Sequence, residues 1–348
     1  MQLTYHPFTV RKRYALTISR GTTAQSTNIW VKIAHDGIEG WGEASPFSTG
    51  ARPQHSEDLR SALADLVPIL APLHPLDRQS VEDILAKRDT LSAVRAAIDT
   101  ALHDWLGKKA GLPLWRLWGL DRDRIVLTSG TVGISSPEAA RARTRQWLQA
   151  GVGAIKVKLG SPEGIEADRA MFEAVRSELP PNTPTSIDAN GGWMLEDAIS
   201  MSHWLSDRGV SYLEQPLPPE AIDTFAQLYR QSALPIFADE SCWVSPDLSR
   251  LADRVHGINI KLMKCGGLSE ARRTIDTARS LGIQVMFGCY SDSVLANTAM
   301  TQLAPLADYL DLDSHLNLTD DPFVGASIRQ GRLLPNELPG LGVTRTNS

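Results

Sequence analysis

Cysteine is scarce in this 348-residue chain, and its pattern supports no disulfide framework. The cysteines, Cys242, Cys265 and Cys289, form no CxxC pair and are too few to staple a domain. The N-terminus has no apolar run of signal-peptide length, and no stretch approaches the length of a membrane span. We therefore expect a cytoplasmic protein without a membrane partner.

An excess of positive charge is also missing. The formal net charge is −5, which argues against nucleic acid or an anionic membrane as the main partner. Hydrophobic residues make up 42% and charged residues 22%, the balance of an ordinary globular protein, and the length suits a large domain with a smaller one. The partners left open are small molecules and, in a homo-oligomer, other copies of the chain.

The chain changes character at about residue 118. Before it, residues 14–33 and 38–44 alternate like strands, with a turn at residues 35–37, and helical stretches follow. The clearest helix has apolar residues at the spacing of one buried face and closes at Gly111. Residues 1–118 are therefore predicted to form an α+β domain.

The remainder repeats at a period of roughly 25 residues, in which a short apolar strand precedes an amphipathic helix. A parallel (β/α) barrel over residues 119–316 fits this period better than a doubly wound sheet, and no strand is followed by a glycine-rich dinucleotide fingerprint. Residues 317–348 are expected to return to the first domain. The predicted strands are 128–134, 154–159, 185–190, 212–216, 236–240, 258–264, 285–289 and 309–313.

Charged residues interrupt these strands near their C-terminal ends, although strands buried on both faces should be almost wholly apolar. Each such residue alone is more often a helix cap, a turn former or a solvated side chain. Their shared position favours one common site, because barrel enzymes place their active sites at this end. Lys261 precedes the predicted strand end and receives no role. The residues of the predicted site are Lys156, Lys158, Asp188, Glu214, Asp239, Lys264, Asp311 and Asp313.

Three of these residues form a predicted metal site. Asp188, Glu214 and Asp239 offer carboxylates with no histidine or cysteine beside them. Hard oxygen donors of this kind select Mg²⁺ over zinc. We therefore expect one Mg²⁺ with positions left for water and substrate oxygens.

The lysines suggest the reaction. Lys156 and Lys158 stand two apart on one strand, so both should point into the barrel, while Lys264 is expected from a strand on the other side of the metal. A substrate carboxylate on Mg²⁺ is polarised, so its α-proton becomes removable. One lysine would remove that proton, and the other would return one to the opposite face.

These motifs resemble the enolase superfamily, the muconate-lactonizing subgroup, and within it the dipeptide epimerases. The resemblance spans nearly the full length and rests on GWGEASPF, AAIDTALHDWLGKKAGLPL, KVK, DAN, EQPLP, ADES, NIKLMKCGG and DLD. It implies an enolase-like modified (β/α) barrel whose mouth is capped by the N-terminal domain. The implied roles are metal binding by Asp188, Glu214 and Asp239, acid/base catalysis by Lys158 and Lys264, and tuning of Lys158 by Lys156.

Asp311 and Asp313 carry the narrower expectation about the substrate. The pair resembles the two aspartates with which dipeptide epimerases bind the free amino terminus of the substrate. Two residues of this spacing on a strand both face the barrel mouth. Thr131 and Arg52 complete the predicted substrate contacts. Family members that act on Ala-Glu carry an arginine in the first mobile loop, just after an Arg-Gly pair. This chain lacks it, and Arg52 in the next loop is the alternative cation, so the second residue of the dipeptide stays open.

Several alternatives share this site. Muconate cycloisomerase, o-succinylbenzoate synthase and N-succinylamino acid racemase use the same lysines but need no ammonium grip. A sugar-acid dehydratase of the mandelate racemase type would want a histidine on the seventh strand, where FGCYSDS has none. A binding barrel without catalysis would bury charges without use, at a cost in stability. The prediction is therefore Mg²⁺-dependent epimerisation of a dipeptide at the carbon next to its carboxylate.

Overall fold

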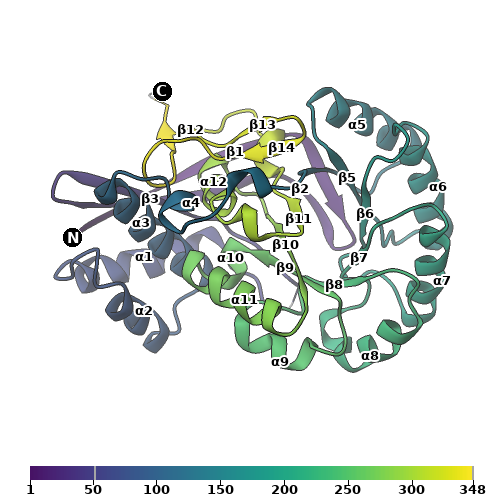
Figure 1. Ribbon diagram of the computed structural model, residues 1–348, viewed down its shortest axis with the longest axis horizontal. Helices are drawn as coiled ribbons and strands as arrows, with labels where there is room; N and C mark the ends of the chain where they lie inside the picture. Colours follow the sequence, from purple (N-terminus) through teal and green to yellow (C-terminus); the bar gives the residue numbers. More distant parts are fainter. Residues whose placement is uncertain (51, 347–348) are drawn as a thin grey trace.

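The N-terminal part of the protein is a three-stranded antiparallel sheet with helix α3 packed against it (Figure 1). The computed structural model describes residues 1–50 and 52–346. Strand β2 lies in the middle and pairs with both β1 and β3. The elements are β1 (Gln2–Ile18), β2 (Gly21–His35), β3 (Ile38–Ala44), α1 (Ser56–Leu70), α2 (Arg78–Lys87), α3 (Ser92–Ala110) and α4 (Leu114–Leu117).

The contact between α3 and β3 depends on two glycines. A Cβ atom at Gly42 would lie 2.0 Å from Ala97 O, and one at Gly40 would lie 2.1 Å from Ala101 O. No side chain fits at such distances, so glycine at both positions lets the helix backbone approach the strand. Helix α3 ends where the sequence predicts, with Gly111 in the left-handed conformation at φ 70°.

The larger part of the protein is a barrel of eight parallel strands. The strands follow chain order around the ring, and a parallel bridge between Thr128 and Leu310 joins the first strand to the last. No helix of eight residues or more follows the last strand within the described residues before the chain turns back, so this is the predicted modified (β/α) barrel. The strands are β4 (Ser129–Val132), β5 (Ala154–Lys158), β6 (Thr185–Asp188), β7 (Leu213–Glu214), β8 (Ile236–Ala238), β9 (Gly257–Lys261), β10 (Gln284–Gly288) and β11 (Tyr309–Asp311).

The helices of the barrel surround the strands (Figure 1). Helix α5 shows how the sequence forms them: the Ser136 side chain accepts a hydrogen bond from Ala139 N, Pro137 occupies the first turn, and Trp147 is buried. The helices are α5 (Pro137–Gln149), α6 (Ile165–Arg176), α7 (Leu195–Ser206), α8 (Ile222–Gln231), α9 (Leu248–Leu251), α10 (Leu262–Cys265), α11 (Leu268–Ser280) and α12 (Val294–Thr301).

The β1–β2 hairpin joins the two parts at the C-terminal ends of the barrel strands. Thr17 O accepts a hydrogen bond from Ile134 N at 2.9 Å, just beyond β4. At the tip of the hairpin, Ser19 Oγ donates to Asn190 O at 3.0 Å, just beyond β6. The N-terminal part therefore contributes to whatever site the strand ends form.

The C-terminal segment contacts the N-terminal part. Asp320 pairs with Arg11 at 2.6 Å, and Leu341 N donates to Asp104 Oδ1 at 2.7 Å. Two short strand pairs form on the way, β12 (Phe323–Val324) with β15 (Thr344–Arg345) and β13 (Ser327–Arg329) with β14 (Arg332–Leu334). The domain limits at residues 118 and 316 stay a prediction.

Most predicted strands extend past the observed ends by a few residues, and two predicted strands are wrong in a way that affects the site. The stretch 14–33 is not one strand, because a turn at Ser19 and Arg20 divides it between β1 and β2, with Gly21 at φ 140°. The predicted strand 258–264 stops at Lys261, and the helical turn α10 follows. That turn ends at Gly266, whose φ of 89° suits glycine and terminates a helix.

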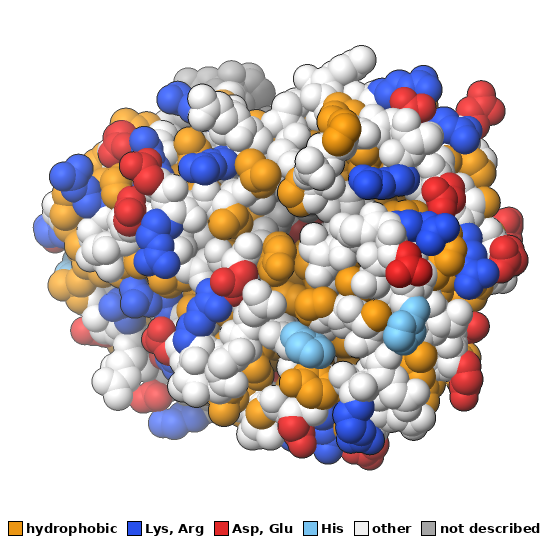
Figure 2. Space-filling model, turned by 45° about the vertical axis from the view of Figure 1, so that its right-hand side comes forward, with side chains coloured by type: hydrophobic (Ala, Val, Ile, Leu, Met, Phe, Trp, Pro, Cys, Tyr) orange, Lys and Arg blue, Asp and Glu red, His pale blue; other side chains and the backbone are white. Residues whose placement is uncertain are grey.

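The outer surface carries charges of both signs. On the face shown in Figure 2, basic and acidic side chains are interspersed, with apolar side chains scattered between them. Some of these charges link neighbouring parts of the barrel, as Arg145 does with Glu178 at 2.7 Å. Among the described residues, no helix combines the length and the apolar character that a membrane crossing requires.

Candidate active site and metal centre

Three buried carboxylates stand at the C-terminal ends of consecutive barrel strands. Asp188 ends β6, Glu214 ends β7, and Asp239 directly follows β8. One oxygen of each lies within 4.8 Å of the others, and all three residues are 0% exposed. Buried carboxylates at this spacing need cations beside them. Three oxygen donors without nitrogen or sulfur fit the Mg²⁺ ion that the sequence predicts.

Burial and neighbouring charges shift these acids in different directions. Burial and the Asp188 charge raise the pKa of Glu214 to about 8. Burial acts in the same direction at Asp188 and Asp239, but neighbouring lysines outweigh it and lower the pKa of both carboxyls. Within the described residues Glu214 shares its ion-pair partner, Lys156, with Asp188 and Asp311, so a bound cation would favour the charged form of Glu214.

Lys156 and Lys158 of β5 both point into the barrel. Lys158 Nζ lies 2.5 Å from Asp188 Oδ2, and the side chain lines the cavity over the strand ends. Lys156 Nζ lies 2.6 Å from Glu214 Oε2 and 2.7 Å from Asp311 Oδ2. Burial opposes its charge, but these carboxylates outweigh burial and hold the pKa of Lys156 well above its usual value. Lys156 is therefore a fixed positive charge beside Lys158.

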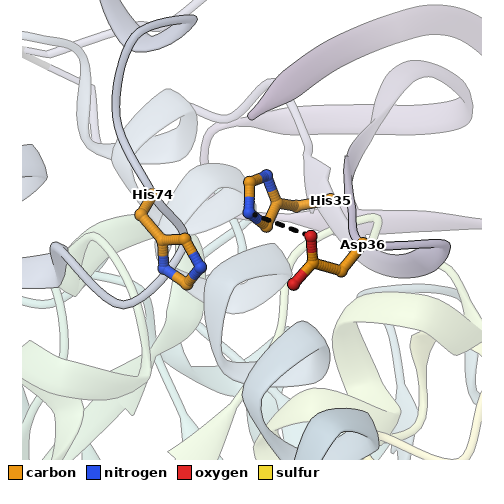
Figure 3. Close-up of side chains that lie close together, drawn as sticks. All are labelled: His35, Asp36 and His74. Atoms are coloured by element: carbon orange, nitrogen blue, oxygen red, sulfur yellow. Dashed lines mark ion pairs between the residues drawn. The ribbon is translucent and has the colours of Figure 1, made fainter.

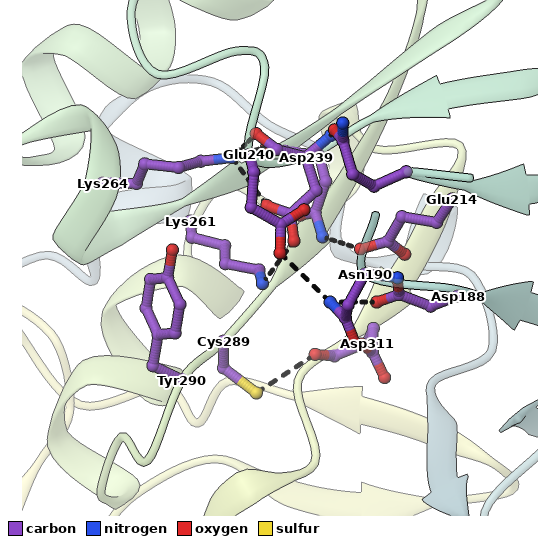
Figure 4. A network of polar contacts seen from close by, with 12 residues as sticks. Asp188, Asn190, Glu214, Asp239, Glu240, Lys261, Lys264, Cys289, Tyr290 and Asp311 are labelled. Atoms are coloured by element: carbon purple, nitrogen blue, oxygen red, sulfur yellow. Dashed lines mark hydrogen bonds and ion pairs between the residues drawn. The ribbon is translucent and has the colours of Figure 1, made fainter. Parts of the chain in front are cut away.

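Two further lysines approach Asp239 (Figure 4). Lys261, the last residue of β9, lies 2.7 Å from Asp239 Oδ2 and lines the cavity. Lys264 lies in α10, and its Nζ donates to Asp239 O, to Asp239 Oδ1 at 2.7 Å and to Asn259 O at 3.0 Å. These bonds use all three protons of the Lys264 ammonium, and Lys264 is not among the lining residues of the cavity. The structure thus brings Lys261, and not the predicted Lys264, to the cavity.

The position of the strand end explains this correction. The sequence pattern favours Lys264 as the charged residue at the strand end and gives Lys261 no role. The sequence did contain a signal, because Lys261 is followed by LMKCGG, in which the two glycines can end a short helical turn. A residue in that turn no longer follows the side-chain alternation of the strand.

Asp311 and Asp313 lie with Lys158 in a small cavity of about 40 Å³. Thr131 holds both, because its N–H donates to Asp313 Oδ2 at 2.6 Å and its hydroxyl to Asp311 Oδ1 at 3.2 Å. Burial and the Asp311 charge raise the pKa of Asp313. Asp311 has Lys156 as a partner, whereas Asp313 forms no ion pair within 4.0 Å in the part of the chain that the structure describes. An ammonium group placed here would meet two fixed acceptors.

A cavity of about 660 Å³ lies between the barrel mouth and the N-terminal part. Lys158, Asn190 and Lys261 contribute the barrel side, and residues of β1, of the hairpin turn and of the segment after β3 contribute the other side. Arg20 at the hairpin tip is held by Glu240 Oε1 at 2.6 Å and by Asn190 O at 2.7 Å. Arg20 and Asn190 have no predicted role: residues 14–33 are predicted as one strand, without a turn at Arg20, and Asn190 stands out only as part of the DAN motif.

Arg52 is not brought to the cavity. It is exposed, and its guanidinium lies 5.3 Å from the centre of the Trp243 ring. Arg52 is absent from the lining residues of the cavity, whereas the predicted contact Thr131 lines the small cavity beside Lys158. The structure therefore gives Arg52 no contact of the predicted kind.

A second group of metal-ligand residue types lies away from the cavity. His35, Asp36 and His74 meet where the β2–β3 turn faces the loop after α1 (Figure 3). His74 Nδ1 accepts a hydrogen bond from Leu76 N at 3.1 Å, so a neutral His74 carries its proton on the other ring nitrogen. Asp36 Oδ2 lies 3.5 Å from Lys109 Nζ. These contacts account for the group without a metal ion.

The two-part fold and the site at the barrel mouth can be compared with known proteins. The family model described as mandelate racemase / muconate lactonizing enzyme, N-terminal domain, matches residues 3–119, and the enolase C-terminal domain-like model matches residues 139–347. A hydrophobic dipeptide epimerase of Roseobacter litoralis is 42% identical over 98% of either chain. An L-Ala-D/L-Glu epimerase of Bacteroides thetaiotaomicron is 36% identical over 99% of this chain and 88% of its own length.

A solved structure agrees with these matches. The dipeptide epimerase from Enterococcus faecalis, complexed with Mg and the dipeptide L-Leu-L-Tyr, aligns over 99% of both chains with a TM-score of 0.91 and 29% identity. The alignment covers the N-terminal part as well as the barrel, so the shared features are not limited to a common barrel. The chain belongs to the enolase superfamily, with the N-terminal domain of the mandelate racemase / muconate lactonizing enzymes.

Proposed function

We propose that the protein is a Mg²⁺-dependent dipeptide epimerase. The observation that carries this proposal is the placement of Lys158 on β5 and Lys261 on β9, which flank the three strands that present the carboxylates. Both lysines line the same cavity, so an α-carbon held there has a proton-transfer group on each side. The activities named for the most similar proteins point the same way.

The chain's own residues divide the work. Mg²⁺ held by Asp188, Glu214 and Asp239 would polarise a substrate carboxylate and make the adjacent α-proton easier to remove. Lys158, as a neutral amine, takes that proton from one face, and Lys261, as an ammonium, delivers another proton to the opposite face. One proton leaves and one arrives, so the product differs from the substrate in one configuration. The opposite protonation states run the reverse reaction.

The aspartate pair supplies the preference for dipeptides. Asp311 and Asp313 would accept hydrogen bonds from the free ammonium of the first residue, while Thr131 keeps both carboxylates in place. An N-succinyl amino acid lacks this ammonium, so it would leave the pair without a partner.

We infer a cytoplasmic location from the three free cysteines, which suit a reducing compartment.

Hydrogen exchange at the α-carbon tests the proposal. The enzyme with Mg²⁺ is incubated in D₂O with a panel of dipeptides and with N-succinyl amino acids, and the uptake of one deuterium is followed by mass spectrometry. We expect dipeptides with free amino termini to exchange and to epimerise. Faster turnover of an N-succinyl amino acid than of any dipeptide would move the protein to the racemase alternative.

A further inference from the structure

Lys12 of β1 is a cation of the cavity that the reaction above does not use. Its side chain lines the 660 Å³ cavity and also the small cavity that contains Asp311 and Asp313. A β-bridge to Leu318 holds the backbone of Lys12 against the C-terminal segment, directly beyond the barrel strand ends. Lys12 therefore lies at the end of the cavity where the proposed function places the amino terminus of the substrate.

Among the described residues, Lys12 differs from the other cations of the cavity in having no carboxylate partner. Lys158 contacts Asp188 at 2.5 Å, Lys261 contacts Asp239 at 2.7 Å, and Arg20 contacts Glu240 at 2.6 Å. In the described residues, 1–50 and 52–346, no carboxylate lies within 4.0 Å of the Lys12 ammonium.

The surroundings of Lys12 do not compensate its charge. Burial lowers the pKa of Lys12, and the attraction of Asp313 and Asp292 does not offset that effect. The Cys289 thiol on the same side adds no charge, because burial raises its pKa to about 12. A half-buried ammonium in this state gains from an anion brought by a ligand.

A second unpaired cation stands beyond the same small cavity. The Arg143 guanidinium lies 4.5 Å from the Tyr14 ring centre and 4.0 Å from the Trp147 ring centre, and it has no ion pair among the residues that the structure describes. Arg143 lines a neighbouring cavity of about 310 Å³ that shares residues, among them Thr131, with the small one. Two cations without a carboxylate partner in the described residues, Lys12 and Arg143, therefore lie near the aspartate pair that would hold the amino terminus of the substrate.

The dipeptide's own charged ends do not satisfy Lys12. Under the proposed function the substrate carboxylate belongs at Asp188, Glu214 and Asp239, and the ammonium takes the Asp311–Asp313 pair. Once the ammonium occupies Asp313, Lys12 loses the attraction of that carboxylate. The side chain of the first residue is the part of a dipeptide that starts closest to this ammonium, so it is the part that can bring an anion to Lys12.

We propose that Lys12 is a specificity residue that receives a carboxylate on the side chain of the first residue, so that the enzyme favours dipeptides beginning with an acidic residue. This inference rests on the proposed function and names the substrate class of the same site. A succinyl group would present a similar carboxylate from the same end, but without the ammonium that the aspartate pair accepts. The two sources of the carboxylate, an acidic first residue and a succinyl group, can therefore be distinguished by experiment.

The test compares Glu-Leu, Gln-Leu, Ala-Leu and N-succinyl-leucine in kcat/KM for α-hydrogen exchange in D₂O. Glu and Gln side chains have the same shape, so their ratio isolates the charge. We expect Glu-Leu to exceed Gln-Leu by about tenfold in the unaltered enzyme and the ratio to fall to about one in Lys12→Met. N-succinyl-leucine should be slower than Glu-Leu.

A matched variant and an internal reference keep the outcomes distinct. Arg13→Met removes the exposed neighbouring cation on the same strand and should retain the Glu-Leu preference. A ratio of one in the unaltered enzyme, or an unchanged preference in Lys12→Met, would overturn the inference. Because each ratio is measured within one variant, partial misfolding does not affect it. If no dipeptide exchanges at all, the proposed function fails first.

Discussion

The two sides of the cavity are held together in different ways. On the barrel side, Lys158 and Lys261 each contact a carboxylate at 2.7 Å or less. On the N-terminal side the cavity is lined by apolar groups and hydroxyls such as Phe47 and Thr22, and Arg20 is paired with Glu240. Lys12 has no carboxylate within 4.0 Å among the residues that the structure describes. The barrel side has a fixed arrangement of charges suited to one reaction. Substitutions on the N-terminal side can therefore change which substrate is preferred without disturbing that arrangement.

Substituting a metal ligand on the barrel side should have the largest effect on activity. Asp239→Asn removes one of three ligand charges, and we expect activity to fall about 10⁴-fold, because the ion stabilises the charge that develops on the substrate. Calorimetric Mg²⁺ titration measures the loss of metal affinity, and the α-hydrogen exchange rate of Ala-Leu measures the loss of activity. Glu178→Gln, which breaks only the surface pair with Arg145, is the control and should change neither. Full activity after exhaustive chelation would contradict the metal's role.

Substitution of either lysine of the proposed mechanism should stop proton transfer on one face of the α-carbon and leave it on the other. Lys158→Ala and Lys261→Ala should each lower epimerisation by about 10²–10⁴-fold, yet each variant should still exchange the α-hydrogen of one epimer. Deuterium uptake is measured from each epimer separately. Exchange of both epimers by one of these variants would show that a single base serves both faces.

Lys264 provides the contrast. Lys264→Met leaves the buried Asp239 carboxylate with one cation fewer, so we expect a loss of about 3 kcal/mol in the free energy of unfolding and similar treatment of both epimers. Urea unfolding and the same exchange assay measure the two effects. Exchange restricted to one epimer in Lys264→Met, but not in Lys261→Ala, would restore Lys264 as the base.

The sequence predicts the barrel side far better than the N-terminal side. Asp188 and Glu214 were identified because a charge in an apolar, buried strand is conspicuous, and the strand period fixes where the strand ends. Lys264 was misplaced because one helical turn follows β9 directly, and strand limits are set by such local turns. Lys12 carried no signal, since its place in the cavity depends on the pairing of β1 with β2 and on the bridge to Leu318.

A change inside the N-terminal part should act on stability and leave the barrel chemistry intact. In Gly42→Ala the added Cβ would meet Ala97 O at 2.0 Å, so α3 must move away from β3, and we expect a loss of about 3 kcal/mol in the free energy of unfolding. Gly37→Ala is the matched control, because its Cβ meets open space and only the left-handed φ of 72° costs about 1 kcal/mol. Urea unfolding compares them. Equal losses in both variants would show that the close helix–strand contact is not what requires glycine.

The smallest effect is expected at the second residue of the dipeptide. A distal carboxylate entering a capped cavity needs a cation. Arg20 is held by Glu240, and Arg52 is exposed beside the Trp243 ring, so neither side chain is placed to supply that charge. Lys12 lies at the amino-terminal end, so it should read the first residue instead. We expect kcat/KM for Ala-Glu and Ala-Leu to agree within about tenfold. A preference for Ala-Glu of about a hundredfold, or about 2.7 kcal/mol, would show that a cation does reach this end when the substrate binds. Loss of that preference in Arg52→Ala would then identify the cation as Arg52, and would mean that the loop carrying it closes over the cavity.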